Sequence, residues 1–375
     1  MERTKCYKLT DGTAMDIHDM LAYFVKYGPM RVSDLHIKIG QPPALRIDGD
    51  LIKLKGPGLS EKQAESLIMP LMNPEKTERL KTEYDIDLSY MYKNLQFRIN
   101  VFKENDGICA AVRALGIDIP PVETVGFPNE TWKTIINKKH GLVLLTGITG
   151  AGKSTTISSL IDRINQTRAC RIISLEDPIE YICRSNKSII SQREIGRDAA
   201  SFNSGLKALL REDPDVIFVG EMRDPETISM TLMAAETGHL VFSTLHTRDT
   251  RGTITRILDY FPPDRHTEVQ NQLSLGLAYI ICQKLVPRKD GDGRIVAMEI
   301  LNNNYGCANL IRTGKVEQLY SLLQTKTRNR PDENMISLER HLAELVKGDK
   351  VDLSEARKWT NDPKCFEDEM KWNRP

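Results

Sequence analysis

The sequence feature that most constrains this chain is the octapeptide at residues 147–154, GITGAGKS. Its G-x-x-x-x-G-K-S pattern is that of the phosphate-binding P-loop. An apolar run at 141–145 precedes it and predicts a buried parallel strand, and residues 156–164 after it have the spacing of a helix. Because the motif needs a strand before it and a helix after it, this context favours a P-loop on an α/β sheet over an ordinary glycine-rich turn.

The residue types of this loop suit the phosphates of a nucleotide. The glycines let backbone N–H groups curl around phosphate oxygens, and the N-terminus of the following helix adds positive potential. We expect Lys153 to reach the β- and γ-phosphates of ATP and the Ser154 hydroxyl to ligate Mg²⁺. The nucleotide-binding residues predicted in the loop are Gly147, Thr149, Gly150, Ala151, Gly152, Lys153, Ser154 and Thr155.

Two further predicted strands end in carboxylates. The apolar run 216–219 leads through a glycine to Glu221, and the run 172–175 leads directly to Glu176. P-loop NTPases need carboxylates to hold Mg²⁺ and to orient the attacking water. We predict that Glu176 polarises the water, with Glu221 as its competitor, and that Glu221 serves the metal or its water. A lone acid at a strand end is more often a solvated surface group, but two such strands after a P-loop favour a catalytic site.

Two histidines flank the predicted strand 240–244. His239 precedes it and His246 follows it, and strand alternation would place their side chains on opposite faces, so a shared metal is not expected. Ligands of open α/β sheets bind at the carboxyl ends of the strands. We therefore predict that His246 contacts the γ-phosphate and that His239 contacts the nucleotide. A satisfied structural histidine is the alternative for each.

The strand and helix patterns divide the chain into parts. We expect a flexible extension over residues 1–14, a small α+β domain over 15–116 and a proline-bearing linker over 117–128. The ATPase domain would fill 129–375 and be helical from about residue 300. After the P-loop, strands at 172–175, 216–219 and 240–244 alternate with helices near 202–211, 225–236 and 250–259. This alternation predicts a parallel sheet flanked by helices.

Charge and hydropathy exclude several classes of protein. With 52 basic and 51 acidic residues the net charge is +1, so no nucleic-acid partner is expected. The first six residues contain no apolar stretch, so we expect no secretory signal, and no run approaches the 18 apolar residues of a membrane helix. The seven cysteines form no C-x-x-C pair, so no structural zinc site is expected. Any role at a membrane would come through a partner.

Longer motifs make the chain resemble a known family. The segments in question are 176–181 (EDPIEY), 192–196 (QREIG), 210–217 (LREDPDVI), 234–239 (AAETGH) and 243–247 (STLHT). They resemble the Asp box, Walker B motif and His box of the secretion-type hexameric ATPases. Within this family the chain is similar to the branch that retracts type IV pili, and the likeness extends to 33–37 (SDLHI) and 97–101 (FRINV). It covers roughly residues 15–360.

The resemblance implies a fold, a site and a function. It implies a PAS-like N-terminal domain, a RecA-like P-loop core and a helical C-terminal region. It also implies a cytoplasmic homohexamer, peripheral at the inner membrane through a platform protein, in which ATP hydrolysis powers pilus retraction and twitching motility. Nucleotide would lie between the two domains and be completed by a neighbouring subunit. By motif position, Arg98 and Arg113 match N-terminal-domain arginines that approach the γ-phosphate.

Two departures from the family pattern leave other hypotheses open. Asp106 stands where an arginine is usual, and residues 306–313 (GCANLIRT) keep only the centre of the motif tied to retraction. An accessory retraction ATPase working with a paralogue is therefore one alternative. A pilus-assembly or type II secretion ATPase is a second, although that branch usually carries a tetra-cysteine zinc insertion and an extra N-terminal domain. A nucleotide-gated scaffold with negligible turnover is a third, and a DNA translocase fits the near-neutral charge poorly.

Overall fold

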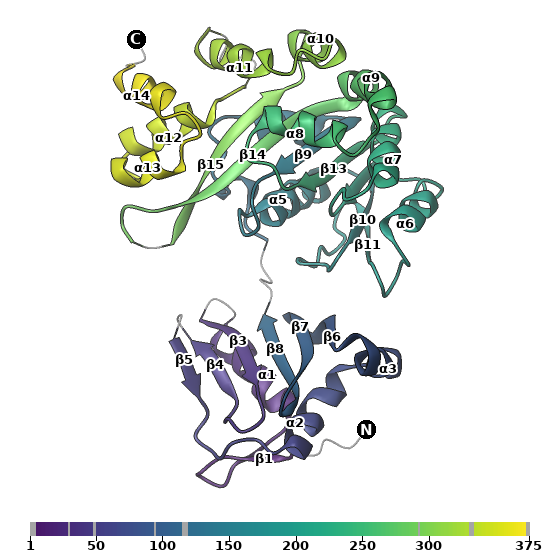
Figure 1. Ribbon diagram of the computed structural model, residues 1–375, viewed down its shortest axis with the longest axis vertical. Coiled ribbons are helices and arrows are strands. Elements are labelled where there is room, and N and C mark those ends of the chain that lie inside the picture. The colour runs from purple at the N-terminus through teal and green to yellow at the C-terminus, as the bar shows by residue number, and fades with distance from the viewer. Residues whose placement is uncertain are drawn as a thin grey trace. The chain divides into compact units, whose positions relative to one another are not determined.

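A computed structural model describes residues 5–28, 31–47, 50–93, 95–114, 119–291, 293–329 and 334–372. The chain forms two compact units (Figure 1), each of which is described by itself. The first comprises Met1–Asp118 with Pro178–Ile182, and the second comprises Ile119–Asp177 with Cys183–Pro375. Residues 117 and 118 of the predicted linker lie outside the described part. Linker residue Val122, in the short helix η2 (Val122–Thr124), is buried in the core of the second unit.

The first unit is built on a six-stranded antiparallel sheet with the order β5-β4-β3-β8-β7-β6. Among its described residues, three α-helices and the short 3-10 helix η1 accompany the sheet, and Phe24 of α1 packs edge-on against Phe97 of β7. Asp16 and Ser60 each close a capping box at the start of a helix. The elements are α1 (Ile17–Tyr27), β3 (Val32–Ile37), β4 (Ala44–Ile47), β5 (Asp50–Lys53), α2 (Glu61–Ile68), η1 (Met69–Leu71), α3 (Pro74–Glu83), β6 (Asp85–Tyr92), β7 (Leu95–Glu104) and β8 (Gly107–Ala114).

The start of the chain differs from the prediction. The strands β1 (Tyr7–Lys8) and β2 (Ala14–Met15) pair antiparallel, and the Tyr7 side chain is fully buried with its hydroxyl donating to Pro57 O. A flexible extension over residues 1–14 is therefore wrong for this stretch, while residues 1–4 lie outside the described part. The polar composition of residues 1–14 gave no indication that the Tyr7 side chain packs into the core of the first unit.

The second unit is built on a seven-stranded sheet with the order β11-β10-β12-β13-β9-β14-β15. Every neighbouring pair is parallel except β14 and β15, which form an antiparallel hairpin. The predicted parallel sheet is thus confirmed, while the hairpin at its edge was not predicted. The strands are β9 (Gly141–Thr146), β10 (Arg171–Glu176), β11 (Ile189–Glu194), β12 (Val216–Val219), β13 (Leu240–Leu245), β14 (Leu277–Pro287) and β15 (Arg294–Asn302).

Helices cover both faces of this sheet (Figure 1). Alternate residues of its strands enter two separate cores. Leu142 and Leu144 of β9 join one core, and Val143 and Leu145 join the other. The first core takes side chains from α6 (Phe202–Leu209), α7 (Pro225–Glu236), α8 (Thr250–Leu258) and α9 (His266–Gly276). The second takes side chains from α4 (Thr131–Asn137) and α5 (Lys153–Thr167). A sheet covered in this way leaves only its strand ends for polar chemistry.

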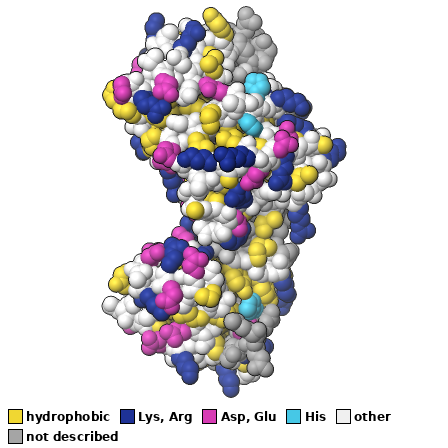
Figure 2. Space-filling view, turned by 90° about the vertical axis from the view of Figure 1, so that its right-hand side faces the viewer, with side chains coloured by type: hydrophobic (Ala, Val, Ile, Leu, Met, Phe, Trp, Pro, Cys, Tyr) yellow, Lys and Arg dark blue, Asp and Glu magenta, His cyan; other side chains and the backbone are white. Residues whose placement is uncertain are grey.

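Helices fill most of the chain beyond residue 302, as the sequence predicts. They are α10 (Tyr305–Arg312), α11 (Gln318–Asn329), α12 (Leu338–Lys347), α13 (Leu353–Trp359) and α14 (Pro363–Lys371). In the described part of the chain, no helix combines the length and apolar character needed to cross a membrane. Basic and acidic side chains are interspersed on the face drawn in Figure 2, in keeping with a net charge of +1.

Candidate active site

The P-loop connects β9 to α5 and is held in a tight conformation. The Lys153 side chain is buried, and its Nζ donates to Gly147 O at 2.8 Å and to Ile148 O at 3.2 Å. Gly147 has φ 142°, and a Cβ there would lie 2.5 Å from Gln283 O of β14. Glycine is therefore required at this position by both backbone conformation and space. The loop ends at Gly152, from which α5 begins.

Gln283 supports the loop from the neighbouring strand β14. Its side chain is fully buried, and Nε2 donates to Ala151 O at 2.6 Å. Beside it, Lys284 Nζ donates to Trp359 O and to Asn361 Oδ1, each at 2.7 Å. A cavity of about 340 Å³ lies between the start of the loop and these C-terminal residues. Sequence reasoning missed Gln283 because the contact joins residues 132 positions apart.

Glu176 ends β10 as a buried carboxylate. Its Oε1 accepts from Ser174 Oγ at 2.6 Å and from Gln192 Nε2 of β11 at 3.0 Å. Ser174 is two residues earlier on the same strand, so both side chains leave the same face of the sheet. These donors orient the carboxylate, and the sequence analysis predicted neither of them.

Glu221 follows β12 and lies in a charged cluster. Its Oε2 accepts from Arg223 at 2.8 Å, and its Oε1 lies 3.3 Å from His246 Nε2. Arg223 also approaches Asp177, at 4.0 Å. The Glu221 side chain is 18% exposed and that of His246 is 45% exposed, so both are open to a ligand or to water.

The strand register explains why these groups gather at one edge. Leu175 of β10 pairs with Val219 of β12, and Leu245 of β13 pairs with Thr146 of β9, the residue before the P-loop. Residues that follow these parallel strands therefore leave the sheet at the same edge. This edge brings together the P-loop with Lys153 and Ser154, the two carboxylates Glu176 and Glu221, and His246.

His239 requires a correction. It precedes β13, and His239 O accepts from Gly141 N at the first residue of β9. Its ring Nδ1 is 2.9 Å from Ala234 O, at the C-terminal end of α7. The six residues of β13 span about 20 Å, so His239 lies at the edge opposite the P-loop. The prediction that it contacts the nucleotide of its own chain is wrong, because a residue before a strand lies at the amino edge of the sheet.

Arg98 and Arg113 belong to the first unit, on β7 and β8. They are directly opposite each other in the strand pairing. Arg113 Nε donates to Asp34 Oδ1 at 2.7 Å, and Arg98 lies 3.6 Å from Asp87. Both arginine side chains are about half exposed or more.

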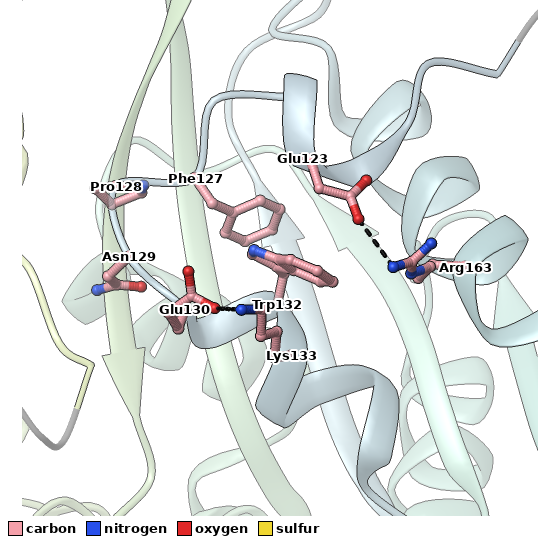
Figure 3. Close-up of a pocket in the computed structure, with 8 residues that line it drawn as sticks. All are labelled: Glu123, Phe127, Pro128, Asn129, Glu130, Trp132, Lys133 and Arg163. Atoms are coloured by element: carbon pink, nitrogen blue, oxygen red, sulfur yellow. Dashed lines mark ion pairs between the residues drawn. The ribbon is translucent and has the colours of Figure 1, made fainter. Parts of the chain in front are cut away.

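A second cavity in the second unit is separate from the P-loop. Its volume is about 490 Å³. Figure 3 shows Phe127 and Trp132 on its wall and the ion pair between Glu123 and Arg163. The charged atoms of this pair are 3.1 Å apart. Arg163 lies ten residues after Lys153 on α5, which is about 15 Å along the helix axis. This cavity therefore lies toward the far end of α5 from the phosphate loop.

The arrangement at the strand edge can be compared with known proteins. The family described as Type II/IV secretion system protein matches residues 20–360. The chain belongs to this family. Among the similar proteins, the type IV pilus retractation ATPase PilT of Pseudomonas aeruginosa is 42% identical over 312 residues, covering 83% of this chain and 89% of PilT. The type IV pilus ATPase PilU of the same species is 34% identical over 343 residues, covering 91% of this chain and 88% of PilU.

A solved structure extends the likeness to three dimensions. The crystal structure of the pilus retraction motor PilT with bound ADP matches with a TM-score of 0.86 and 42% identity, covering 94% of this chain and 99% of that one. The predicted fold class is thereby confirmed: a RecA-like P-loop core, an N-terminal PAS-like domain and a helical C-terminal region. In this member of the family, the sequence motifs predicted which residues lie at the strand edge. The structure adds Gln283, which supports the P-loop, and Ser174 and Gln192, which orient Glu176.

Proposed function

We propose that this protein is an ATPase that works as a homohexameric motor and powers retraction of a type IV pilus. The observation that carries the proposal is the joint placement of the P-loop, Glu176 and Glu221 at one sheet edge, in a chain 42% identical to PilT over 83% of its length. The PilT structure with bound ADP supports nucleotide binding at this loop.

Each residue at this edge has a proposed role in hydrolysis. The backbone of the P-loop holds the phosphates, and Lys153 moves from its two carbonyl partners to the β- and γ-phosphates. Glu176, oriented by Ser174 and Gln192, aligns the attacking water and accepts its proton. Glu221 serves the metal and its water, and His246 lies beside it to contact the γ-phosphate.

The groups at this edge also fit Mg²⁺. Its preferred ligands are oxygens, and the Ser154 hydroxyl at the start of α5 and the Glu221 carboxylate are of this kind. Among the described residues there is no group of three or more His, Cys, Asp or Glu that could hold a metal by themselves. That suits Mg²⁺, which usually keeps waters and takes its remaining ligands from phosphates. When bound, the ion would neutralise charge on the β- and γ-phosphate oxygens.

Arg98 and Arg113 are proposed to complete the site of a neighbouring subunit. An arginine supplied in trans neutralises charge that develops on the transferred phosphoryl group, an effect worth about 10³–10⁵ in rate where measured. Such a contact would couple hydrolysis to the arrangement of subunits in the ring. Asp106, which replaces a basic residue of the family pattern, would leave this contact with fewer positive charges.

The motor is proposed to act in the cytoplasm on an inner-membrane platform protein of the pilus machine. Changes of domain angle around the ring would turn that protein and draw pilin out of the filament. No nucleic-acid partner is proposed, because the net charge is only +1.

The deciding experiment is a count of surface pili together with a twitching assay in a strain that lacks this gene. A retraction motor predicts excess pili and no twitching. Bald cells would instead indicate an assembly ATPase. A complementing plasmid that carries the intact gene controls for effects on neighbouring genes.

An accessory retraction ATPase is the second candidate. The match to PilU covers a larger share of this chain than the match to PilT does. At the edges of the altered retraction motif stand Gly306, in helix α10, and Thr313, the residue that follows this helix. This hypothesis predicts near-normal pili and twitching in the deletion strain. A paralogous retraction ATPase would then supply the remaining activity.

A further inference from the structure

A row of charged residues crosses the open face of the N-terminal sheet. Asp34 of β3 pairs with Arg46 of β4 on one side and with Arg113 of β8 on the other, and Arg113 pairs in turn with Arg98 of β7. Direct partners in antiparallel strands project from the same face. We call Arg46, Arg113 and Arg98 the arginine row. Asp34 is a member of the SDLHI motif, to which no function has so far been given.

Asp34 is the buried anchor of this row. Its side chain is 9% exposed, while that of Arg113 is 68% exposed. Arg113 Nε donates to Oδ1 and Ser33 Oγ donates to Oδ2, both at 2.7 Å, and Arg46 Nε lies 3.9 Å from Oδ2. Burial by itself would raise the pKa of Asp34, but the hydrogen bonds from Ser33 and Arg113 and the charge of Arg113 outweigh it and hold that pKa below its ordinary value. Asp34 is therefore an ionised carboxylate in the folded protein.

The contact with Asp34 uses only one edge of the Arg113 guanidinium. Among the described residues, neither terminal nitrogen of Arg113 has a hydrogen-bond partner. These nitrogens carry donors in a fixed planar arrangement that suits phosphate oxygens. Arg98 stands directly opposite Arg113, and like charges in that position repel. An anion bound between the two arginines would remove this repulsion.

We propose that Asp34 is a positioning residue that holds Arg113 by Nε, so that its terminal nitrogens face a phosphate group. The ligand would be the terminal phosphate of a nucleoside triphosphate held at the P-loop of a neighbouring chain, an assignment that rests on the proposed function. Ser33 keeps the carboxylate in place, and Arg46 adds positive charge on its other side. The SDLHI motif would thus serve hydrolysis through Arg113 without touching the nucleotide itself.

The Arg98–Asp87 pair provides a matched comparison on the same sheet. It also joins an arginine of the row to an aspartate, but both side chains are about half exposed and the charged atoms are 3.6 Å apart. Exposed pairs of this kind contribute little, whereas a buried, charge-assisted hydrogen bond orients its partner firmly. Asp87→Asn should therefore change ATP turnover by no more than about threefold.

The test is steady-state ATP turnover by the purified full-length chain and its variants Asp34→Asn, Arg113→Ala and the double variant. Asp34→Asn should lower kcat by about ten- to a hundredfold, as expected for loss of a charge-assisted hydrogen bond, with little change in the KM for ATP. The double variant should have the kcat of Arg113→Ala alone, because Asp34 acts only through Arg113. A merely structural role would reduce kcat further in the Arg113→Ala background, because that loss would not act through Arg113.

Two results would overturn the proposal: an Asp34→Asn protein with wild-type kcat, or full additivity of the two substitutions. If Asp34→Asn fails to fold, Ser33→Ala offers a milder loss of the same support and should lower kcat severalfold, again only when Arg113 is present. The proposed function fails separately. If Arg113→Ala turns over ATP at the wild-type rate, the proposed role of Arg113 as a trans arginine is refuted. If Arg113→Ala is slow while Asp34→Asn and Ser33→Ala have normal turnover, only the proposed role of Asp34 is refuted.

Discussion

In the parallel sheet of the second unit, the candidate catalytic groups follow the strand ends, whereas in the antiparallel sheet of the first unit they stand on an open face. The parallel sheet has a core on each side, so its strand interiors carry apolar side chains and its polar groups come after β9, β10, β12 and β13. The antiparallel sheet buries one face against helices and aligns charged side chains on the other. The surface that a sheet leaves uncovered therefore decides where its polar groups gather. They gather at the strand ends of the parallel sheet and along one face of the antiparallel sheet.

The two sheets also hold buried carboxylates in opposite states. Asp34 on the antiparallel sheet has Arg113 as a partner, and its pKa lies below the ordinary value despite burial. Glu299 of β15 is buried and accepts a hydrogen bond from Thr250 N at 2.8 Å. Burial raises the pKa of Glu299 to about 7, and the nearby Glu339 and Asp249 add to the effect. A buried carboxylate thus stays charged where a cation faces it and takes up a proton where acids surround it.

The largest effect should come from the strand edge. Lys153→Ala removes the ammonium that donates to Gly147 O and Ile148 O and that is proposed to reach the phosphates. We expect ATP turnover to fall by about 10³-fold or more. Phosphate release from the purified protein measures this, with the exposed Lys139→Ala as a control. Unchanged turnover in Lys153→Ala would mean that this edge is not the active site.

Glu176→Gln tests which carboxylate at the edge serves the water. It keeps the size of the side chain but removes the base, so kcat should fall by about 10²–10⁴-fold while nucleotide still binds. Glu221→Gln should lower kcat by less, since Glu221 is proposed to bind the metal or the water that the metal holds. Single-turnover hydrolysis separates chemistry from binding, and Glu212→Gln, which alters an exposed acid paired with Arg193, is the control. A larger loss in Glu221→Gln would exchange the two roles.

A smaller effect is expected from the support behind the P-loop. Gln283→Leu keeps the buried volume of the side chain but removes its hydrogen bond to Ala151 O. One neutral hydrogen bond corresponds to about a two- to tenfold change, which should appear mainly in the KM for ATP. Gln283→Glu is a useful second variant. It places a carboxylate opposite the Ala151 carbonyl, so it should raise the KM for ATP more than Gln283→Leu does. An unchanged KM in both variants would show that β14 does not shape the loop.

The smallest effect on activity, but a clear one on stability, is expected from Glu299→Gln. The pKa of Glu299 in the folded chain is about 7, above that of an exposed glutamate, so the unfolded chain releases the proton first as pH rises. The free energy of unfolding therefore falls between about pH 4.5 and pH 7, by about 3 kcal/mol in total. Glu299→Gln should resemble the natural protein at pH 5 and be more stable at pH 8.

Chemical denaturation at the two pH values measures this difference. Asp34→Asn should behave in the opposite way, since Asp34 has a lowered pKa and its stabilising contribution is present at neutral pH and lost as pH falls through that value. His341, whose pKa burial lowers to about 4, also destabilises the fold toward acid and is present in all variants. Equal stability of the natural protein and Glu299→Gln at pH 8 would contradict a costly ionisation at this site.

Local sequence patterns were sufficient to predict much of the fold and to name the candidate residues that the structure gathers at one sheet edge. The P-loop, the acids Glu176 and Glu221 and the caps Asp16 and Ser60 depend on neighbours within a few residues, and short-range signals of that kind can be recognised in one chain. The helical character of the chain beyond about residue 300 was also predicted. Patterns failed where an isolated feature had to be placed in space, as with Tyr7 and His239.

Residues far apart in the sequence supplied what these patterns could not. The β14–β15 hairpin, the contact of Gln283 with Ala151 and the pairing of Asp34 with Arg113 all join positions whose relation exists only after the strands have paired. The strand register aligns arginines that are far apart in the sequence into one row. It also places His239 and His246 at opposite edges of one sheet. The amino-acid sequence thus specified which chemical groups this protein possesses and which turn of chain has the pattern of a phosphate-binding loop. Long-range pairing set which of those groups meet, because hydrogen bonding between strands fixes position and facing side together.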